Sequence, residues 1–154
     1  MIKIMFICHG NICRSPMAEF VFKDMVHERG LDDCFVINSC ATSTEEIGNP
    51  IYPPAQAELR RQGVPFGGHR AVQLTRADYD KYDYLIGMDD MNVRNIGRIV
   101  GYDGKKKVHK LLDFTHRGGS VADPWYTDRF DTAFRDIREG CEGLLEYILA
   151  HDMQ

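Results

Sequence analysis

The sequence has little that a secreted, membrane-spanning or nucleic-acid-binding protein needs. Basic residues are not in excess, because 19 Lys and Arg stand against 23 Asp and Glu and the formal net charge is −4. A nucleic-acid-binding domain is usually strongly basic, and the longest basic run, residues 105–110, is interpreted as a solvated loop that leads into a strand. The apolar stretch near the start, residues 4–7, is shorter than the roughly 7–15 apolar residues of a signal peptide or the roughly 20 of a membrane span. We therefore expect neither nucleic acid nor a membrane as a partner.

The few cysteines do not suggest a disulfide framework. The sequence has five, an odd number, and shows no secretory leader. Free thiols in a reducing cytoplasm are therefore expected, with Cys34, Cys40 and Cys141 in the hydrophobic core. The paired C-x₂-C spacing typical of zinc sites is also absent, so we expect no metal ion.

The pattern along the 154 residues predicts one α/β domain that spans residues 1–154. A chain of this length buries roughly 68–70% of the surface that its unfolded form exposes, which is enough for a stable core. Short apolar runs typical of buried strands alternate with longer stretches of helical periodicity. The predicted strands are 2–8, 35–40, 84–88 and 108–112, and the predicted helices are 16–29, 54–62, 75–82, 89–96 and 130–148. This alternation implies a central parallel sheet of about four strands with helices on both faces.

A short loop that begins at Cys8 joins the first predicted strand to the first predicted helix. The strand is a nearly unbroken apolar run, which is typical of a central strand covered on both faces. Ser15 is a suitable N-cap and Pro16 a suitable first residue for the helix, which Gly30 ends. The loop should therefore lie at the carboxyl edge of the sheet, where folds of this kind bind ligands.

Cys8 and Arg14 in this loop are candidates for attacking and binding a phosphate group. A cysteine six residues before an arginine is a weak signal by itself, and its place between a buried strand and a helix start strengthens it. Inward-facing backbone N–H groups and a helix N-terminus attract an anion, and the planar guanidinium of Arg14 can grip two phosphate oxygens. The same positive field favours the thiolate of Cys8, which is the nucleophilic form.

Other loop residues are expected to shape this hollow. Gly10 should supply a backbone angle that other residues resist, and Asn11 a left-handed conformation with hydrogen bonds across the loop. Ser15 should donate a hydrogen bond to the Cys8 thiolate. A zinc site built from Cys8, His9 and Cys13 is disfavoured because it would occupy the same hollow.

The segment from Cys8 to Glu19, CHGNICRSPMAE, resembles the phosphate-binding loop of the low-molecular-weight protein tyrosine phosphatases. Further matches keep their order and approximate spacing over nearly the whole chain. They are Ser39, 41–44, 47–50, 69–71, Tyr84, 88–89 and 123–124. The phosphate-binding loop that the resemblance implies comprises His9, Gly10, Asn11, Ile12, Cys13 and Ser15, between Cys8 and Arg14.

The resemblance implies a cysteine-dependent enzyme that hydrolyses aryl phosphate monoesters through a cysteinyl-phosphate intermediate. Tyrosine-phosphorylated proteins are then the substrates, and no cofactor is needed. Asp123 is implied as the general acid, and after the phenol leaves it serves as the base that activates water. A phenol has a pKa of about 10, so protonating the leaving oxygen lowers the barrier near neutral pH.

The resemblance also implies roles for residues around the loop. Asn11, Ser39 and His69 form a supporting network behind it. Trp125 and Tyr126 form one wall of the substrate cavity.

Three residues near the loop leave their roles open. On the wall opposite Trp125, the family often has an aromatic residue where this chain has Glu45, which predicts that acidic phosphopeptides are disfavoured. Cys13 is either a filler or the partner of Cys8 in a reversible disulfide. Asp89, after the third predicted strand, is either a helix cap or a chemical group.

Three alternative functions stay open at this point. A phosphoarginine phosphatase typically has Thr where this chain has Ile12, so Ile12 favours phosphotyrosine. A thiol-dependent arsenate reductase needs further cysteines near the third strand, and residues 84–100 contain none. A phosphotyrosine-binding module without activity would have no use for a nucleophile. The sequence leaves the oligomeric state undetermined.

Overall fold

Residues 1–153 of the chain are described by a computed structural model, and a four-stranded parallel sheet forms its centre. The strand order is β2-β1-β3-β4, and each neighbouring pair is parallel. The strands are β1 Ile2–Cys8, β2 Phe35–Ala41, β3 Tyr84–Gly87 and β4 Val108–Lys110. The predicted α/β fold with about four parallel strands is confirmed.

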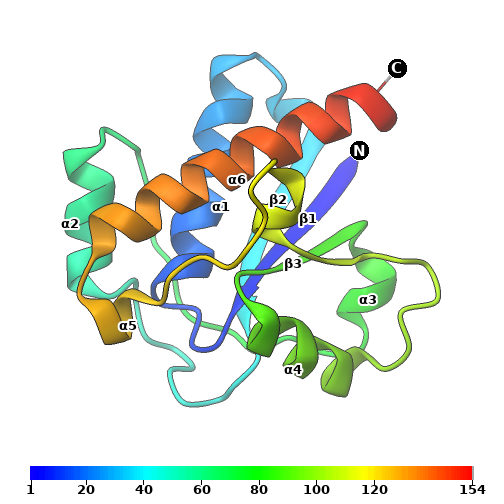
Figure 1. Ribbon diagram of the computed structural model, residues 1–154, viewed down its shortest axis with the longest axis horizontal. Helices are drawn as coiled ribbons and strands as arrows, with labels where there is room; N and C mark the ends of the chain where they lie inside the picture. Colours follow the sequence, from blue (N-terminus) through cyan, green and yellow to red (C-terminus); the bar gives the residue numbers. More distant parts are fainter. Residues whose placement is uncertain (154) are drawn as a thin grey trace.

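Helices cover both faces of this sheet (Figure 1). The helices are α1 Arg14–Glu28, α2 Pro53–Arg61, α3 Asp78–Lys81, α4 Asp90–Val100, α5 Pro124–Thr127 and α6 Phe130–His151. Two short 3₁₀ segments, Asp32–Cys34 and Leu111–Phe114, complete the regular structure. Helices α1 and α6 pack together on one face, and α3 and α4 lie on the other.

The apolar run of β1 explains why the sheet carries two cores. Side chains alternate along a strand, so neighbouring residues point to opposite faces. Ile4 and Phe6 belong to the larger hydrophobic cluster beneath α1 and α6. Met5 and Ile7 belong to a second cluster with residues of α4. A central strand buried on both faces must therefore be apolar at nearly every position.

The start of α1 differs from its prediction. The helix begins at Arg14, with Cys13 at the cap position and no side-chain cap, so Ser15 is not the N-cap and Pro16 is the third helical residue. The Ser15 hydroxyl is instead occupied with Asn11 and Cys8. Proline is tolerated there because backbone N–H groups in the first turn have no acceptor within the helix.

Several predicted boundaries also shift. The helix predicted over 75–82 is only the single turn of α3, and α4 continues to Val100, beyond the predicted residue 96. The last strand ends at Lys110 because a 3₁₀ turn follows it at once. The segment predicted as a loop, 115–127, contains α5. Among residues 1–153, no helix is long and apolar enough to cross a membrane.

The fold brings the ends of β1 and β3 to one edge of the sheet. Ile7 pairs with Gly87 in register, so Cys8 and the residues after β3 leave the sheet side by side. The N-terminus and the C-terminal end of α6 lie at the opposite end of the strands (Figure 1). The β1–α1 loop is therefore the place where distant segments converge at the carboxyl edge.

Candidate active site

A cavity of about 330 Å³ opens at this edge of the sheet. Its lining is Cys8, His9, Gly10, Ile12, Cys13, Arg14, Glu45, Glu46, Asp89, Asn92, Asp123, Trp125 and Tyr126. The structure thus brings together most of the residues singled out in the sequence. A second cavity, of about 450 Å³ beside Phe20 and Phe66, has no cysteine in its lining.

The thiol of Cys8 lies at the floor of the cavity and is almost fully buried, with 3% of the residue exposed. The Ser15 hydroxyl lies 3.0 Å from the Cys8 sulfur, and the Ser15 backbone N–H donates to that sulfur at 3.4 Å. The expected contact between these two side chains is therefore present. The hydroxyl and the backbone N–H of Ser15, in the first turn of α1, thus both lie against the sulfur.

The loop is held by hydrogen bonds from Asn11, as predicted. Asn11 has a φ of 60°, in the left-handed region that asparagine tolerates better than most residues. Its side-chain nitrogen donates to the hydroxyls of Ser15 at 2.8 Å and Ser39 at 3.0 Å. Its side-chain oxygen accepts from the Val72 backbone N–H at 3.2 Å. The side chain of Asn11 thus connects the loop to Ser15, Ser39 and Val72, so the loop has little freedom to change shape.

Ser39 and His69 lie behind the loop, in the places that the resemblance implied. His69 donates from Nε2 to the Asn11 carbonyl at 2.8 Å. Ser39 donates to the carboxylate of Glu19 at 2.6 Å, and Glu19, nearly buried, also accepts from Lys23 at 2.6 Å. Glu19 was not predicted as part of this network. Its spacing of one helical turn from Ser15 was the available signal.

Gly10 was expected to supply an unusual backbone angle, and this reason is wrong. Gly10 is not among the glycines of residues 1–153 that have a positive φ. A Cβ at this position would instead meet the Cγ of Glu46 at 3.3 Å, tighter than most such contacts. Close approach between two chain segments therefore explains this glycine better than an unusual backbone angle.

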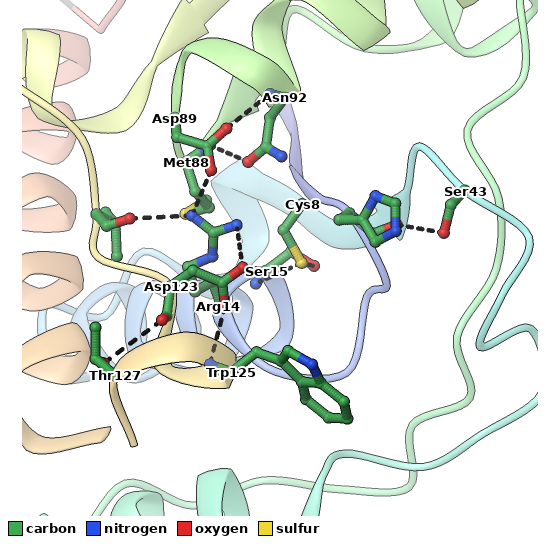
Figure 2. A network of polar contacts seen from close by, with 12 residues as sticks. Cys8, Arg14, Ser15, Ser43, Met88, Asp89, Asn92, Asp123, Trp125 and Thr127 are labelled. Atoms are coloured by element: carbon green, nitrogen blue, oxygen red, sulfur yellow. Dashed lines mark hydrogen bonds and ion pairs between the residues drawn. The ribbon is translucent and has the colours of Figure 1, made fainter. Parts of the chain in front are cut away.

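Arg14 is buried, with 3% of the residue exposed, and is held from several directions. Its Nη1 donates to Asp89 at 2.8 Å and to the Val121 carbonyl at 3.0 Å, and its Nη2 donates to Asp123 at 3.4 Å. Figure 2 shows the guanidinium between the two carboxylates. Burial works against the charge, but the negative charges of Cys8, Asp123 and Asp89 outweigh it and raise the pKa of Arg14. The guanidinium is thus fixed and permanently charged beside the Cys8 sulfur.

Asp89 is a helix cap, one of the two roles considered for it, and it also binds Arg14. One carboxylate oxygen accepts from Asn92 N–H at 2.7 Å and caps α4, and the other accepts from Arg14. Asp89 therefore couples the start of α4 to the guanidinium.

Asp123 reaches the cavity from the segment that precedes α6. The Val121 N–H donates to the Met88 carbonyl at 2.9 Å, which fastens this segment to the end of β3. The Asp123 carboxylate accepts from Trp125 N–H at 3.0 Å and caps the short helix α5. Its other oxygen faces Arg14. Residues 109 positions apart in the sequence thus meet across the cavity.

The residues of both predicted walls line the cavity, Trp125 and Tyr126 from α5 and Glu45 from the segment after β2. Trp125 is 56% exposed and its ring lies 5.3 Å from the ring of Tyr52, a distance typical of aromatic pairs. Tyr126 is more exposed than Trp125. Glu45 contacts the Nε2 of His9 at 2.9 Å. Tyr52 was missed in the sequence, because nothing local shows that it packs against Trp125.

The remaining cysteines are free thiols, as is Cys8. Burial, followed by the charges of Cys8 and Asp123, raises the pKa of Cys13 to about 12. Burial likewise raises the pKa of Cys40 and Cys141, both in the core, whereas Cys34 is only partly buried. The thiols of Cys13, Cys40 and Cys141 therefore stay protonated near neutral pH. In the described part of the chain, no group of three or more His, Cys, Asp or Glu side chains is placed to hold a metal ion.

The fold and the site first define the class of protein. It is an α/β protein with a buried cysteine and a buried arginine on one loop at the carboxyl edge of a parallel sheet. Residues 3–154 match the family model described as "Low molecular weight phosphotyrosine protein phosphatase". The chain belongs to this family.

Individual relatives agree over nearly their whole length. The low molecular weight protein-tyrosine-phosphatase YfkJ of Bacillus subtilis is 38% identical over 150 residues, which cover 96% of each chain. PtpA of Staphylococcus epidermidis is 37% identical over 150 residues, covering 97% of this chain and 95% of PtpA. The crystal structure of YfkJ superposes with a TM-score of 0.95 at 37% identity, covering 99% of this chain and 97% of YfkJ.

Proposed function

We propose that this chain, as one domain over residues 1–154, hydrolyses phosphotyrosine monoesters with Cys8 as the nucleophile. The observation that carries the proposal is the placement of Arg14 and the Ser15 hydroxyl beside the Cys8 sulfur, with Asp123 facing the same cavity. Family membership independently favours a phosphatase. The substrates are then tyrosine-phosphorylated proteins in a reducing compartment, for which we propose the cytoplasm.

In the first step, the loop amides from His9 to Ser15 and the Arg14 guanidinium bind the three terminal phosphate oxygens. The Cys8 thiolate attacks phosphorus on the side opposite the phenol oxygen. The new S–P bond forms as the P–O bond to the phenol breaks, and Asp123 gives its proton to the departing oxygen. The products are a neutral phenol and a phosphocysteine.

In the second step, water attacks the phosphocysteine. Asp123, now a carboxylate, takes a proton from this water as the O–P bond forms. The S–P bond breaks, inorganic phosphate leaves and the Cys8 thiolate returns. A hydrogen bond from Ser15 stabilises the departing thiolate, so the sulfur is a better leaving group.

Other residues hold this arrangement in place. Asn11, Ser39 and His69 fix the shape of the loop, so its N–H groups remain aimed at the phosphate. Trp125 and Tyr126 offer an aromatic wall to the phenyl ring of the substrate. Positioning of this kind matters because a displacement of about 1 Å can lower a rate about 10²-fold.

The test is hydrolysis of an aryl phosphate in the presence of EDTA. The wild-type protein is expected to release phosphate, and Cys8→Ser is expected to abolish release. Cys34→Ser, which removes a partly buried thiol outside the cavity lining, is the matched control and should retain the rate. A Cys8→Ser protein with the wild-type rate would overturn the proposal.

Two further measurements define the substrate. Cys8→Ser should capture tyrosine-phosphorylated proteins, because it binds phosphate but forms no phosphocysteine. A parallel assay with phosphoarginine tests the alternative that Ile12 disfavours. Faster turnover of phosphoarginine than of phosphotyrosine would replace the proposed substrate.

A further inference from the structure

The mouth of the cavity contains two carboxylates that the proposed chemistry does not use, Glu45 and Glu46. Both lie on the segment that follows β2. Backbone N–H groups of Thr42 and Ser43 donate to the carbonyls of Cys8 and His9, each at 3.0 Å. This segment is therefore fastened to the phosphate-binding loop, and its side chains hold a defined place at the mouth.

Each carboxylate has its own contact with the surroundings of the loop. Glu45 lies 2.9 Å from the Nε2 of His9, and 69% of its side chain is exposed. Glu46 accepts from Asn49 at 2.6 Å, and its Cγ lies against Gly10. Glu45 is thus open to a bound substrate, while Glu46 packs directly on the loop beside it.

The charges around the cavity are unbalanced toward negative. Asp89 and Asp123 both face Arg14. In the lining formed by the described residues, Arg14 is the sole Lys or Arg. Because Arg14 is already paired with Asp89 and Asp123, His9 is the one remaining basic residue in this described lining for Glu45 and Glu46.

This imbalance bears on which peptide fits the cavity. Glu45 lines the same cavity as the phosphate-binding loop and is exposed, so a peptide whose phosphate occupies the loop brings the residues next to its phosphotyrosine near this carboxylate. An acidic neighbour there meets like charge and a basic neighbour meets opposite charge, and such complementarity decides specificity.

We propose that Glu45, supported by Glu46, makes this enzyme select phosphotyrosine sites flanked by lysine or arginine. The proposal rests on the phosphatase function proposed above and names its preferred substrate class. Glu45 acts on the flanking residues of the peptide, whereas the loop acts on the phosphate. The preference should therefore appear in peptides and be absent from small aryl phosphates, which have no flanking residues.

The experiment compares two phosphotyrosine peptides that differ only in having lysine or glutamate beside the phosphotyrosine. The measured quantity is the ratio of kcat/KM for the basic peptide to kcat/KM for the acidic peptide. Steps shared by both peptides cancel in this ratio. We expect a ratio of about ten for the wild type, equivalent to about 1.4 kcal/mol.

The variants Glu45→Gln and Glu46→Gln remove charge with little change in shape. Glu45→Gln should lower the ratio about three-fold, and the double variant should bring it to about two or less, in keeping with partly exposed charges. Glu142→Gln, an equal charge change on the exposed face of α6, should keep the wild-type ratio. The wild-type ratio should also fall between about 50 mM and about 500 mM salt, because salt screens exposed charges.

Failure of this inference and failure of the proposed function give different results. No turnover of a small aryl phosphate would overturn the proposed function. Turnover of the aryl phosphate with a peptide ratio near one would overturn this inference alone. A double variant that keeps the wild-type ratio would show that other residues select the peptide and would likewise overturn it.

Discussion

Asp89 accepts a 2.8 Å hydrogen bond from Arg14, a residue 75 positions earlier in the chain, while its other carboxylate oxygen caps helix α4. The guanidinium, which belongs to α1, is therefore held by a residue that follows the end of β3. This arrangement fixes the side chain that is proposed to bind the phosphate, and it depends on one carboxylate performing two tasks.

The two tasks of Asp89 can be separated by mutation. Asp89→Asn keeps an acceptor for the cap but removes one of the two negative partners of Arg14, so we expect kcat/KM for an aryl phosphate to fall about ten-fold. Its free energy of unfolding should stay close to the wild-type value. Asp89→Ala also loses the cap and should lower that free energy by about 1 kcal/mol more. Steady-state kinetics and urea unfolding check both values, and wild-type kcat/KM for Asp89→Asn would refute the coupling.

Asp123 is expected to show its role through the leaving group. Asp123→Ala should slow phosphoryl transfer about 10²–10³-fold for phenols of high pKa, because they need a proton as they leave. Phenols of low pKa leave as stable phenolates and should be slowed much less. The measurement is a series of aryl phosphates under conditions where phosphocysteine formation limits the rate. Equal slowing across the series would exclude Asp123 as the acid.

His109 should make stability depend on pH. Burial lowers its pKa in the folded protein below the unfolded value of about 6.5. Above pH 6.5 the ring is neutral in both states and stability is fully retained. As the pH falls below 6.5 toward the folded pKa, the unfolded chain takes up the proton first, so stability is lost.

The variant His109→Gln removes this dependence. The difference in free energy of unfolding between wild type and His109→Gln should therefore shrink as the pH falls from 7.5 to 5. His27 is the control of opposite sign, because its hydrogen bond with Asp32 raises its pKa. The difference between wild type and His27→Gln should grow over the same range. Parallel curves for wild type and His109→Gln would contradict the expected dependence.

Gly143 is expected to allow the close packing of α6 against the turn at Phe114. A Cβ at this position would clash with the backbone carbonyl of Phe114 in the 3₁₀ turn that follows β4, and backbone cannot move aside as a flexible side chain can. Gly143→Ala should lower the free energy of unfolding by about 1–3 kcal/mol.

Gly97 in α4 provides the matched control for Gly143. A Cβ there meets no atom within 4 Å, so Gly97→Ala should raise the free energy of unfolding by about 0.5–1 kcal/mol through helix propensity. Urea unfolding of both variants tests the pair. A Gly143→Ala protein as stable as the wild type would show that α6 can shift without cost.

Much of the fold was predictable because its signals are local. The apolar run 2–8 predicts a strand covered on both faces, and the periodicity of 130–148 predicts the amphipathic helix α6. The boundaries were less predictable where a turn competes with a regular element. Residues 111–114 form a 3₁₀ turn, and the segment 115–127 contains the short helix α5.

The candidate site also has a part that local signals predict and a part that they do not. Cys8, Arg14 and Asn11 lie on one short loop, so their residue types and spacing indicate a phosphate-binding hollow. The supports of that loop come from distant segments. The spacing of Glu19 from Ser15 indicates a shared face of α1 but does not show that Glu19 accepts from Ser39, and no local pattern shows that Tyr52 packs against Trp125. These contacts depend on how helices and strands are placed relative to one another.

By itself, the sequence determined the α/β class, the loop that contains Cys8 and Arg14, and the residues that resemble a phosphatase site. Periodicity, turn residues and loop spacing carry that information along the chain. Only the tertiary structure decided that Ser15 does not cap α1, that Gly10 allows a close approach, and that Asp89 holds Arg14. These relationships arise where the parallel strands end together, and strand register sets which side chains meet there.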